Sequence, residues 1–304
     1  MSEEILINVT PRETRVAVVE NGMLQELHIE RGWRRGIVGN IYKGRVQRVM
    51  PGMQAAFVEI GHDRAAFLHA NDILRPNVAP TLDDGLEPDA ATAAPVAAGN
   101  GSTPPITELL REGQEIVVQV VKDPIGTKGA RLTTQISIPS RYLVLLPQSR
   151  VVGVSSRIED EAERQRLKAL VAMHNLDAAA PRGYIVRTNA EGQPDEALAE
   201  DIAYLERAWA LVERNVAQAR VGARVYEDLT LPMRTVRDLL RRDVDKVKVD
   251  SRETCDKLRS FAAQYMPELA EKIEHYGGAR PGFDLYGGGG ENQRARGEEG
   301  TLKT

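Results

Sequence analysis

The sequence has 304 residues, of which 42% are hydrophobic, a formal net charge of −4 and one cysteine, Cys255. This length is typical of about two domains of an ordinary globular protein. A single cysteine excludes an internal disulfide framework and a multi-cysteine metal site within one chain. No run approaches the roughly 18 apolar residues of a membrane span, and MSEEILINVT lacks a signal-peptide pattern. We therefore expect a cytoplasmic protein without membrane contact.

The chain opens with a predicted antiparallel meander of three strands. Residues 5–10, 14–20 and 23–30 are strand-like, and Asn21-Gly22 between the last two is a strong hairpin signal. Three strands with no helix directly after them cannot enclose a core. We therefore expect helices from later in the sequence to cover this meander.

A second meander spans residues 39–73, GNIYKGRVQRVMPGMQAAFVEIGHDRAAFLHANDI. Its expected strands, joined by turns at Pro51-Gly52 and Gly61-His62-Asp63, cover residues 40–49, 54–60 and 64–69. Such a meander with basic flanks is typical of an oligonucleotide-binding (OB) barrel. The Ala/Pro/Gly-rich stretch at 75–105 predicts a flexible insertion, and residues 115–122 (EIVVQVVK) predict the last barrel strand.

Strand alternation separates the aromatic residues of this meander from its apolar face. Ala56, Val58 and Ile60 form one apolar row, so Phe57 points to the other, mixed face. Phe67 lies on a mixed face of the next strand. Two aromatic rings on a wet, basic sheet can stack nucleic-acid bases. The alternative is that one or both rings fill the barrel core.

The distribution of charge favours nucleic acid although the net charge is negative. Between residues 31 and 48 there are basic but no acidic residues, whereas between 78 and 107 the reverse holds. The basic run would face phosphates, or it is an ordinary solvated surface. It consists of Arg31, Arg34, Arg35, Lys43, Arg45 and Arg48. Lys43 and Arg45, on the first barrel strand, are candidate RNA-binding residues.

Two later positions could bind a phosphate. Lys128 lies between Gly126 and Gly129, where nothing shields it, although an ordinary loop lysine would look the same. Arg187-Thr188 ends a predicted strand at 184–188. A guanidinium fork and a hydroxyl can clasp a terminal phosphate, but the dipeptide alone also fits a surface arginine.

The remaining elements predict an α+β protein. Strands are expected at 131–138, 142–146 and 246–249, and helices at 106–111, 158–173, 197–216, 231–240 and 252–265. The helix at 197–216 has an apolar stripe at spacings of three and four residues, which includes Trp209. We expect both Trp209 and Cys255 to be packed side chains rather than functional groups.

Several blocks of the chain resemble the bacterial ribonuclease E/G family, and within it the ribonuclease G branch in particular. They include NVTPRETRVAVVENGMLQELHIER, VVKDPIGTKGARLTTQISIPSRYLVLLP and VDSRETCDKL, and the resemblance runs from near Met1 to about Tyr286. It implies an α+β, multi-subdomain fold. An RNase H-like subdomain would comprise residues 1–38 and 218–280, and an OB-fold barrel of the ribosomal-protein-S-one type would be inserted at residues 39–125. Residues 126–217 would form an α/β 5′-sensor subdomain. Residues 281–304 would form a divergent, disordered tail.

The resemblance also implies roles for particular residues. A lysine at the position of Lys128 contacts RNA beside the barrel aromatics in the family. The matching Arg187-Thr188 forms the pocket that senses a 5′-monophosphate, and Val144 matches a backbone contact of that pocket. The implied partner is single-stranded RNA, preferably 5′-monophosphorylated.

The family's catalytic subdomain, which is DNase I-like, has no counterpart in these 304 residues. It carries two magnesium-binding aspartates and a cysteine pair that shares zinc between subunits of a homo-oligomer. We therefore expect no catalytic residue, cofactor or metal in this chain, and no cleavage by it alone. Three hypotheses follow: part of a magnesium-dependent endoribonuclease of rRNA processing and mRNA decay, a non-catalytic RNA-binding module, or a damaged gene product.

Overall fold

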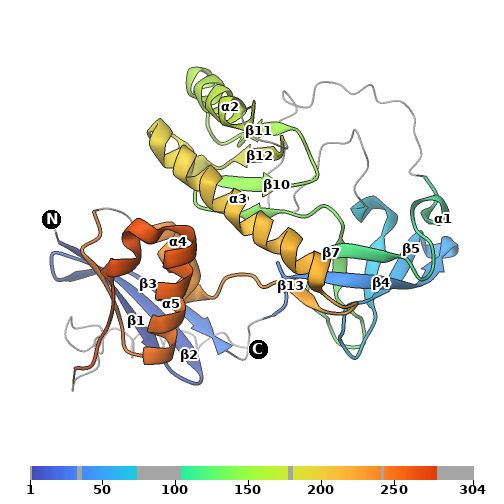
Figure 1. Cartoon of the computed structure of the whole chain (residues 1–304), viewed down its shortest axis with the longest axis horizontal. Helices are drawn as coiled ribbons and strands as arrows, with labels where there is room; N and C mark the ends of the chain where they lie inside the picture. The colour runs from blue at the N-terminus through green and yellow to red at the C-terminus, as the bar shows by residue number, and fades with distance from the viewer. Residues whose placement is uncertain (1, 33–35, 74–103, 177–180, 241–242, 279–304) are drawn as a thin grey trace, which may run out of the picture. The chain divides into compact units, whose positions relative to one another are not determined.

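The computed structural model describes residues 2–32, 36–73, 104–176, 181–240 and 243–278 (Figure 1). They divide into two compact units, and each is treated by itself below. The first unit contains residues 1–35 and 229–304, and the second contains residues 36–228. The expected insertion at 75–105, apart from its last two residues, and the expected tail at 281–304 lie outside the described residues.

The first unit is built on a five-stranded sheet. The meander β1–β2–β3 is antiparallel, whereas β14 pairs parallel with β1 and β15 pairs parallel with β14. Asn21 and Gly22 join β2 to β3 with φ angles of 50° and 81°, as a two-residue hairpin turn requires. In sheet order the strands are β15 (Ile273–His275), β14 (Lys246–Val249), β1 (Glu3–Val9), β2 (Glu13–Glu20) and β3 (Met23–Arg31).

Two helices from late in the sequence cover this sheet, as expected for an opening meander that cannot bury itself. Helix α4 (Leu231–Leu239) contacts β2 and β3, and α5 (Arg252–Tyr265) contacts β14 and β15. The Ser251 side chain caps α5 by accepting a hydrogen bond from the Thr254 N–H, 3.3 Å away. Cys255 is buried in α5, which raises the pKa of its thiol, so it is the packed cysteine that we expected.

The second unit contains a closed five-stranded barrel. Its strands pair in the order β4–β5–β6–β8–β7, and a further β4–β7 pairing closes the ring. Closure leaves no free edge and is consistent with the expected OB-like fold. The barrel strands are β4 (Ile41–Met50), β5 (Ala55–Glu59), β6 (Ala66–His69), β7 (Glu115–Lys122) and β8 (Arg131–Thr133); β13 (Arg224–Tyr226) pairs with β4 outside the ring, and α1 (Ile106–Leu109) precedes β7.

The same unit holds a four-stranded sheet with two helices. Helix α2 contacts β11 and β12, and the long helix α3 contacts β10 (Figure 1). Trp209 is buried on the apolar stripe of α3, as predicted. In sheet order the strands are β11 (Val152–Val154), β12 (Gly183–Val186), β10 (Leu143–Leu146) and β9 (Ile138–Pro139); the helices are α2 (Glu161–Leu176) and α3 (Asp195–Gln218).

The elements differ from the prediction in three respects. The single strand expected at 131–138 is two strands, because β8 belongs to the barrel and β9 to the four-stranded sheet. The strand expected at 184–188 ends at Val186, so Arg187 and Thr188 follow it. The sequence analysis also missed β11, β13 and β15, which have three residues each and are too short for a periodic signal. No helix in the described ranges has the length and apolar character that a bilayer crossing needs.

Candidate nucleic-acid interface

Phe57 and Phe67 lie opposite one another on the outer face of the barrel. They are directly paired between β5 and β6, and their ring centroids are 6.3 Å apart with the ring planes at 70°. Both rings are half-buried, whereas Ala56, Val58 and Leu68 on the inner face are completely buried. The two phenylalanines therefore do not fill the barrel core, and their edge-to-face pairing leaves ring surface at the exterior.

Basic residues lie next to this aromatic pair on the neighbouring strands at both sides. The strand pairings align Arg48 with Phe57, Phe57 with Phe67, Phe67 with Arg131 and Arg131 with Lys122. Side chains of directly opposite residues share a face, so these five form one outer row across the barrel. The Arg131 guanidinium donates two hydrogen bonds, of 3.0 and 3.2 Å, to the carboxylate of Asp72.

Arg48 reaches the outer row because β4 contains a bulge. Strict alternation from the buried Val46 would put Arg48 on the inner face. The β4–β5 register shifts between Val46 and Arg48, so Gln47 is an extra residue and alternation restarts after it. Arg48 is consequently exposed beside Phe57, while Val49 packs against the core. Within the described ranges Arg48 has no ion-pair partner. The sequence placed Arg48 in the basic run but gave no sign of its position beside Phe57.

Lys43 and Arg45 share an acidic neighbour. Glu115 on β7 lies 3.4 Å from the Lys43 ammonium and 3.4 Å from the Arg45 guanidinium. A hydrogen bond from Lys43, together with its charge and that of Arg45, lowers the pKa of the Glu115 carboxyl. Lys43 also donates to the carbonyl of Ala219, 3.2 Å away. The charge that these two candidates present to a phosphate is thus partly offset, although exposed ion pairs of this kind are weak and exchangeable.

Lys128 is exposed in the loop that leads into β8, and the loop is fastened against β6. The Phe67 N–H donates to the Ala130 carbonyl over 2.7 Å, and Arg64 donates to the Gly126 carbonyl. A Cβ at Gly129 would lie 2.0 Å from the Ala65 carbonyl oxygen, so only glycine allows this close approach. The loop therefore carries Lys128 alongside the strand that bears Phe67.

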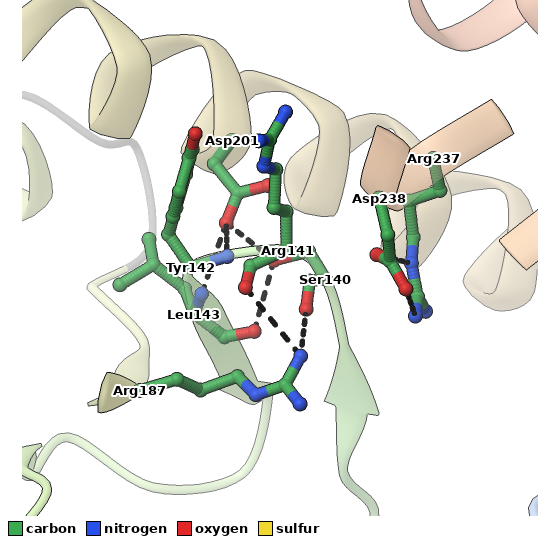
Figure 2. A network of polar contacts seen from close by, with 8 residues as sticks. All are labelled: Ser140, Arg141, Tyr142, Leu143, Arg187, Asp201, Arg237 and Asp238. Carbon is green, nitrogen blue, oxygen red and sulfur yellow. Dashed lines mark hydrogen bonds and ion pairs between the residues drawn. The ribbon is translucent and has the colours of Figure 1, made fainter. Parts of the chain in front are cut away.

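Arg187 and Thr188 form a second candidate site, at the end of β12. The Arg187 Nη1 donates to the Ser140 carbonyl over 2.6 Å and lies 3.5 Å from the Arg141 carbonyl (Figure 2). Its Nε and Nη2 have no hydrogen-bond partner among the residues that the structure describes. Thr188 is half-buried and begins a 3₁₀ turn, Thr188–Ala190. The guanidinium is thus fixed by one nitrogen and keeps two donor groups for a ligand.

Val144 lies in the neighbouring strand, β10, opposite Ile185 of β12. Its side chain is only 5% exposed and packs with Leu146 and Ile185. Its side chain is therefore withdrawn from solvent, and its main chain lies between β12 and β9.

The turn after Thr188 is held by an ion pair on α2. The Glu163 carboxylate accepts the Gly192 N–H over 2.9 Å and is held by the Arg166 guanidinium at 2.7 and 2.8 Å. Arg166 also donates to the carbonyl of Gln193, 2.9 Å away. The hydrogen bonds from Arg166 and from the Gly192 N–H lower the pKa of Glu163 to about 2. This ion pair therefore depends on the charge of Glu163.

We expect Glu163→Gln to destabilise the fold at neutral pH by about 1.5–3 kcal/mol, the range for hydrogen bonds to charged groups. Because the folded-state pKa of Glu163 lies below the ordinary value of 4.5, its stabilisation is complete above about pH 4.5 and is lost as pH falls towards 2. Urea unfolding of both proteins at several pH values measures this. The stability difference between them should shrink below pH 4.5, and a pH-independent difference would contradict the assignment.

A matched control is Glu253→Gln, which removes the ion pair of Glu253 with Lys257 on an exposed face of α5. Lys257 lowers the pKa of the Glu253 carboxyl, but both side chains there are largely solvated, so we expect a much smaller and salt-sensitive change in stability than for Glu163→Gln.

The closed five-stranded barrel, with aromatic side chains on a basic outer face, is consistent with an OB-like fold. The chain belongs to the ribonuclease E/G family, because the model of that family, "Ribonuclease E/G family", matches residues 137–304. "Ribonuclease G" of Salmonella typhimurium (strain SL1344) is 50% identical over 304 residues, which are all of this chain and 59% of that protein. "Ribonuclease E" of Nostoc sp. (strain PCC 7120) is 37% identical over 246 residues, 81% of this chain and 32% of that protein.

The chain thus spans 59% of the length of "Ribonuclease G" from Escherichia coli (strain K12), with which it shares 49% identity. Within the described ranges no three His, Cys, Asp or Glu side chains lie close enough to hold a metal ion.

Proposed function

We propose that this chain is the RNA-binding and 5′-end-sensing part of a ribonuclease G-like endoribonuclease. The observation that supports it most is the edge-to-face pair of Phe57 and Phe67 on the outer face of a closed barrel, with Arg48 beside it. Base stacking on an aromatic ring contributes roughly 1–3 kcal/mol per base and needs unpaired bases. The substrate class that fits is single-stranded RNA.

In this proposal, the aromatic side chains bind RNA bases and the basic side chains bind RNA phosphates. The rings of Phe57 and Phe67 take bases. Lys128 and Arg48 contact phosphates on either side, and Lys43 and Arg45 add a weaker attraction because Glu115 shares them. Phosphate contacts position a strand without reading its sequence, so the barrel would bind many sequences.

The second site would read the 5′ end of the same strand. A terminal monophosphate carries a charge of about −1.5 to −2 at neutral pH and offers three acceptor oxygens. The Nε and Nη2 of Arg187, the Thr188 hydroxyl and the main chain near Val144 supply donors of the matching kind. A 5′-hydroxyl end lacks these acceptors and would gain nothing from the site.

We assign the remaining parts of the chain by analogy with the ribonuclease E/G family. A three-stranded antiparallel meander extended by two parallel strands and covered by α4 and α5 supports an RNase H-like first unit. The α/β region with β10, β12 and α3 would be the 5′ sensor. Magnesium-dependent cleavage, zinc-linked homo-oligomers and a cytoplasmic location belong to the proposal for the longer protein.

The proposal is tested by titrating fluorescently labelled RNA with the protein and following anisotropy. We expect a single strand to bind more tightly than a duplex of the same sequence, and a 5′-phosphorylated strand more tightly than a 5′-hydroxyl strand. Equal affinity for single strand and duplex would contradict the barrel assignment, and equal affinity for both 5′ ends would contradict the sensor assignment.

The exposed cation of the outer row gives a sharper prediction. Removing one phosphate contact to a single strand should reduce the slope of log K against log salt concentration by about 0.7. We expect Arg48→Ala to do so, because Arg48 is exposed beside Phe57. Arg45→Ala is the matched control on the same strand, and its effect should be smaller because Glu115 already offsets its charge. If Arg45→Ala reduced the salt slope more than Arg48→Ala did, the RNA strand would have to lie nearer to Glu115 than to the phenylalanines.

A further inference from the structure

We infer that Asp201 is a positioning residue for the phosphate-binding fork of Arg187, acting through the turn at residues 140–143. The inference rests on the proposed 5′-end sensing by Arg187. It concerns a residue of α3 that has no direct contact with the guanidinium.

Asp201 is a carboxylate in an apolar place. It lies on the buried stripe of α3 between Leu198 and Leu205 and is only 8% exposed. Burial of this kind raises the pKa of the Asp201 carboxyl, and hydrogen bonds from Ser140 and the turn oppose that rise. A buried carboxylate is costly unless donors surround it, so its partners reveal what it holds in place.

Within the part of the chain that the structure describes, the hydrogen-bond partners of Asp201 all belong to one turn. Its Oδ2 lies 2.5 Å from the Ser140 hydroxyl and accepts the backbone N–H groups of Tyr142 and Leu143, each over 3.0 Å (Figure 2). The Ser140 hydroxyl also lies 2.9 Å from the Leu143 carbonyl, so these contacts together fix the path of the backbone from residue 140 to 143. Apolar side chains of similar size could fill the space but could not hold these N–H groups.

The same turn holds Arg187 by its main chain. The Ser140 carbonyl accepts from Nη1 of Arg187 over 2.6 Å, and the Tyr142 carbonyl accepts the Arg187 backbone N–H over 2.8 Å. Ser140 is completely buried and therefore links the two residues, with its hydroxyl on Asp201 and its carbonyl on Arg187. Figure 2 shows Asp201 and Arg187 on opposite sides of this turn.

This arrangement fixes the orientation of the Arg187 guanidinium before a phosphate binds. Nη1 is occupied by carbonyl groups, so the guanidinium presents Nε and Nη2 in one orientation. Without Asp201 the turn would relax, and Arg187 would have to be ordered again on binding. Ordering one long side chain costs an affinity factor of about 2 to 10, and the loss would fall on the 5′-phosphate alone.

The test is the ratio of affinities for 5′-phosphorylated and 5′-hydroxyl versions of one single-stranded RNA. In Asp201→Leu, which fills the space but offers no acceptor to the turn, we expect the ratio to fall about 2- to 10-fold, with the affinity for the 5′-hydroxyl strand unchanged. Val212→Ala is the matched control, because it opens a cavity on the same helix three turns further along and should leave the ratio as in the wild type.

A double-mutant cycle separates positioning from general destabilisation. In an Arg187→Lys background, which keeps part of the preference but lacks the fork, Asp201→Leu should have a smaller effect on the ratio than it has with Arg187 present. An equally large drop there would show that Asp201 acts by another route, and an unchanged ratio in Asp201→Leu alone would overturn the inference while 5′ sensing stands. A wild-type ratio of one would instead contradict the proposed sensor itself.

If Asp201→Leu does not fold, Ser140→Ala gives a milder test. It removes the hydroxyl on Asp201 but keeps the carbonyl on Arg187 and both backbone N–H groups. We expect a smaller fall of the ratio, by a factor of about 2. A wild-type ratio in this variant would likewise overturn the inference.

Discussion

We expect Arg187→Ala to abolish the preference of the protein for a 5′-phosphorylated over a 5′-hydroxyl RNA strand. Each hydrogen bond between a charged donor and a phosphate oxygen contributes about 1.5–3 kcal/mol, so losing even one lowers the affinity for the phosphorylated strand at least about tenfold. The affinity for a 5′-hydroxyl strand should not change, because in the proposed function the barrel alone binds that strand. Paired titrations of the two RNAs with wild type and variant measure both quantities.

Arg187→Lys distinguishes geometry from charge at this site. Lysine keeps the charge but lacks the planar fork, so it should restore only part of the preference. Arg150→Ala, which removes an exposed arginine after β10 in the same sheet region, serves as the control and should leave the preference intact. If Arg150→Ala and Arg187→Ala reduced binding equally for both RNAs, the effect would be general charge loss and not end recognition.

Phe57→Ala should weaken single-stranded RNA binding by roughly 1–3 kcal/mol, about 5- to 150-fold, through the loss of one stacking surface. The ring lies outside the barrel core, so the fold should lose little beyond the aromatic pair with Phe67, which contributes about 0.5–1.5 kcal/mol. Anisotropy titrations report the binding, and urea unfolding reports the stability.

Phe261→Ala is the opposite case and makes a matched control. Phe261 is buried in α5 of the other unit, so its truncation should cost about 3–5 kcal/mol of stability and leave RNA affinity unchanged while the protein is folded. Unchanged RNA affinity in a folded Phe57→Ala protein would show that the aromatic pair does not bind bases.

Local patterns in the sequence were sufficient for much of the barrel site. Alternation on β5 predicted that Phe57 points away from the row of Ala56, Val58 and Ile60, and the structure confirms it. The reason is physical: a strand has a side-chain period of two, so an apolar row on one face assigns the other face without knowledge of the rest of the fold. The same locality explains the correct hairpin at Asn21-Gly22.

Local patterns failed where an irregularity or a distant partner decides the outcome. Arg48 faces outward only because of the bulge at Gln47, which depends on pairing with β5 and breaks the period of two. Likewise, Lys43 and Arg45 looked like open cations until β7 brought Glu115 to them from about 70 residues away along the chain.

The sequence alone therefore determined which residue types are available at both candidate sites, because propensity and alternation act over a few neighbouring residues. Tertiary structure alone decided which of them are available to a ligand. Asp201, Ser140 and Arg187 show why: they are separated by 47 and 61 residues, and only the packing of α3 against β10 brings them together at one turn. Hydrogen bonds over such separations leave no periodic trace in the chain.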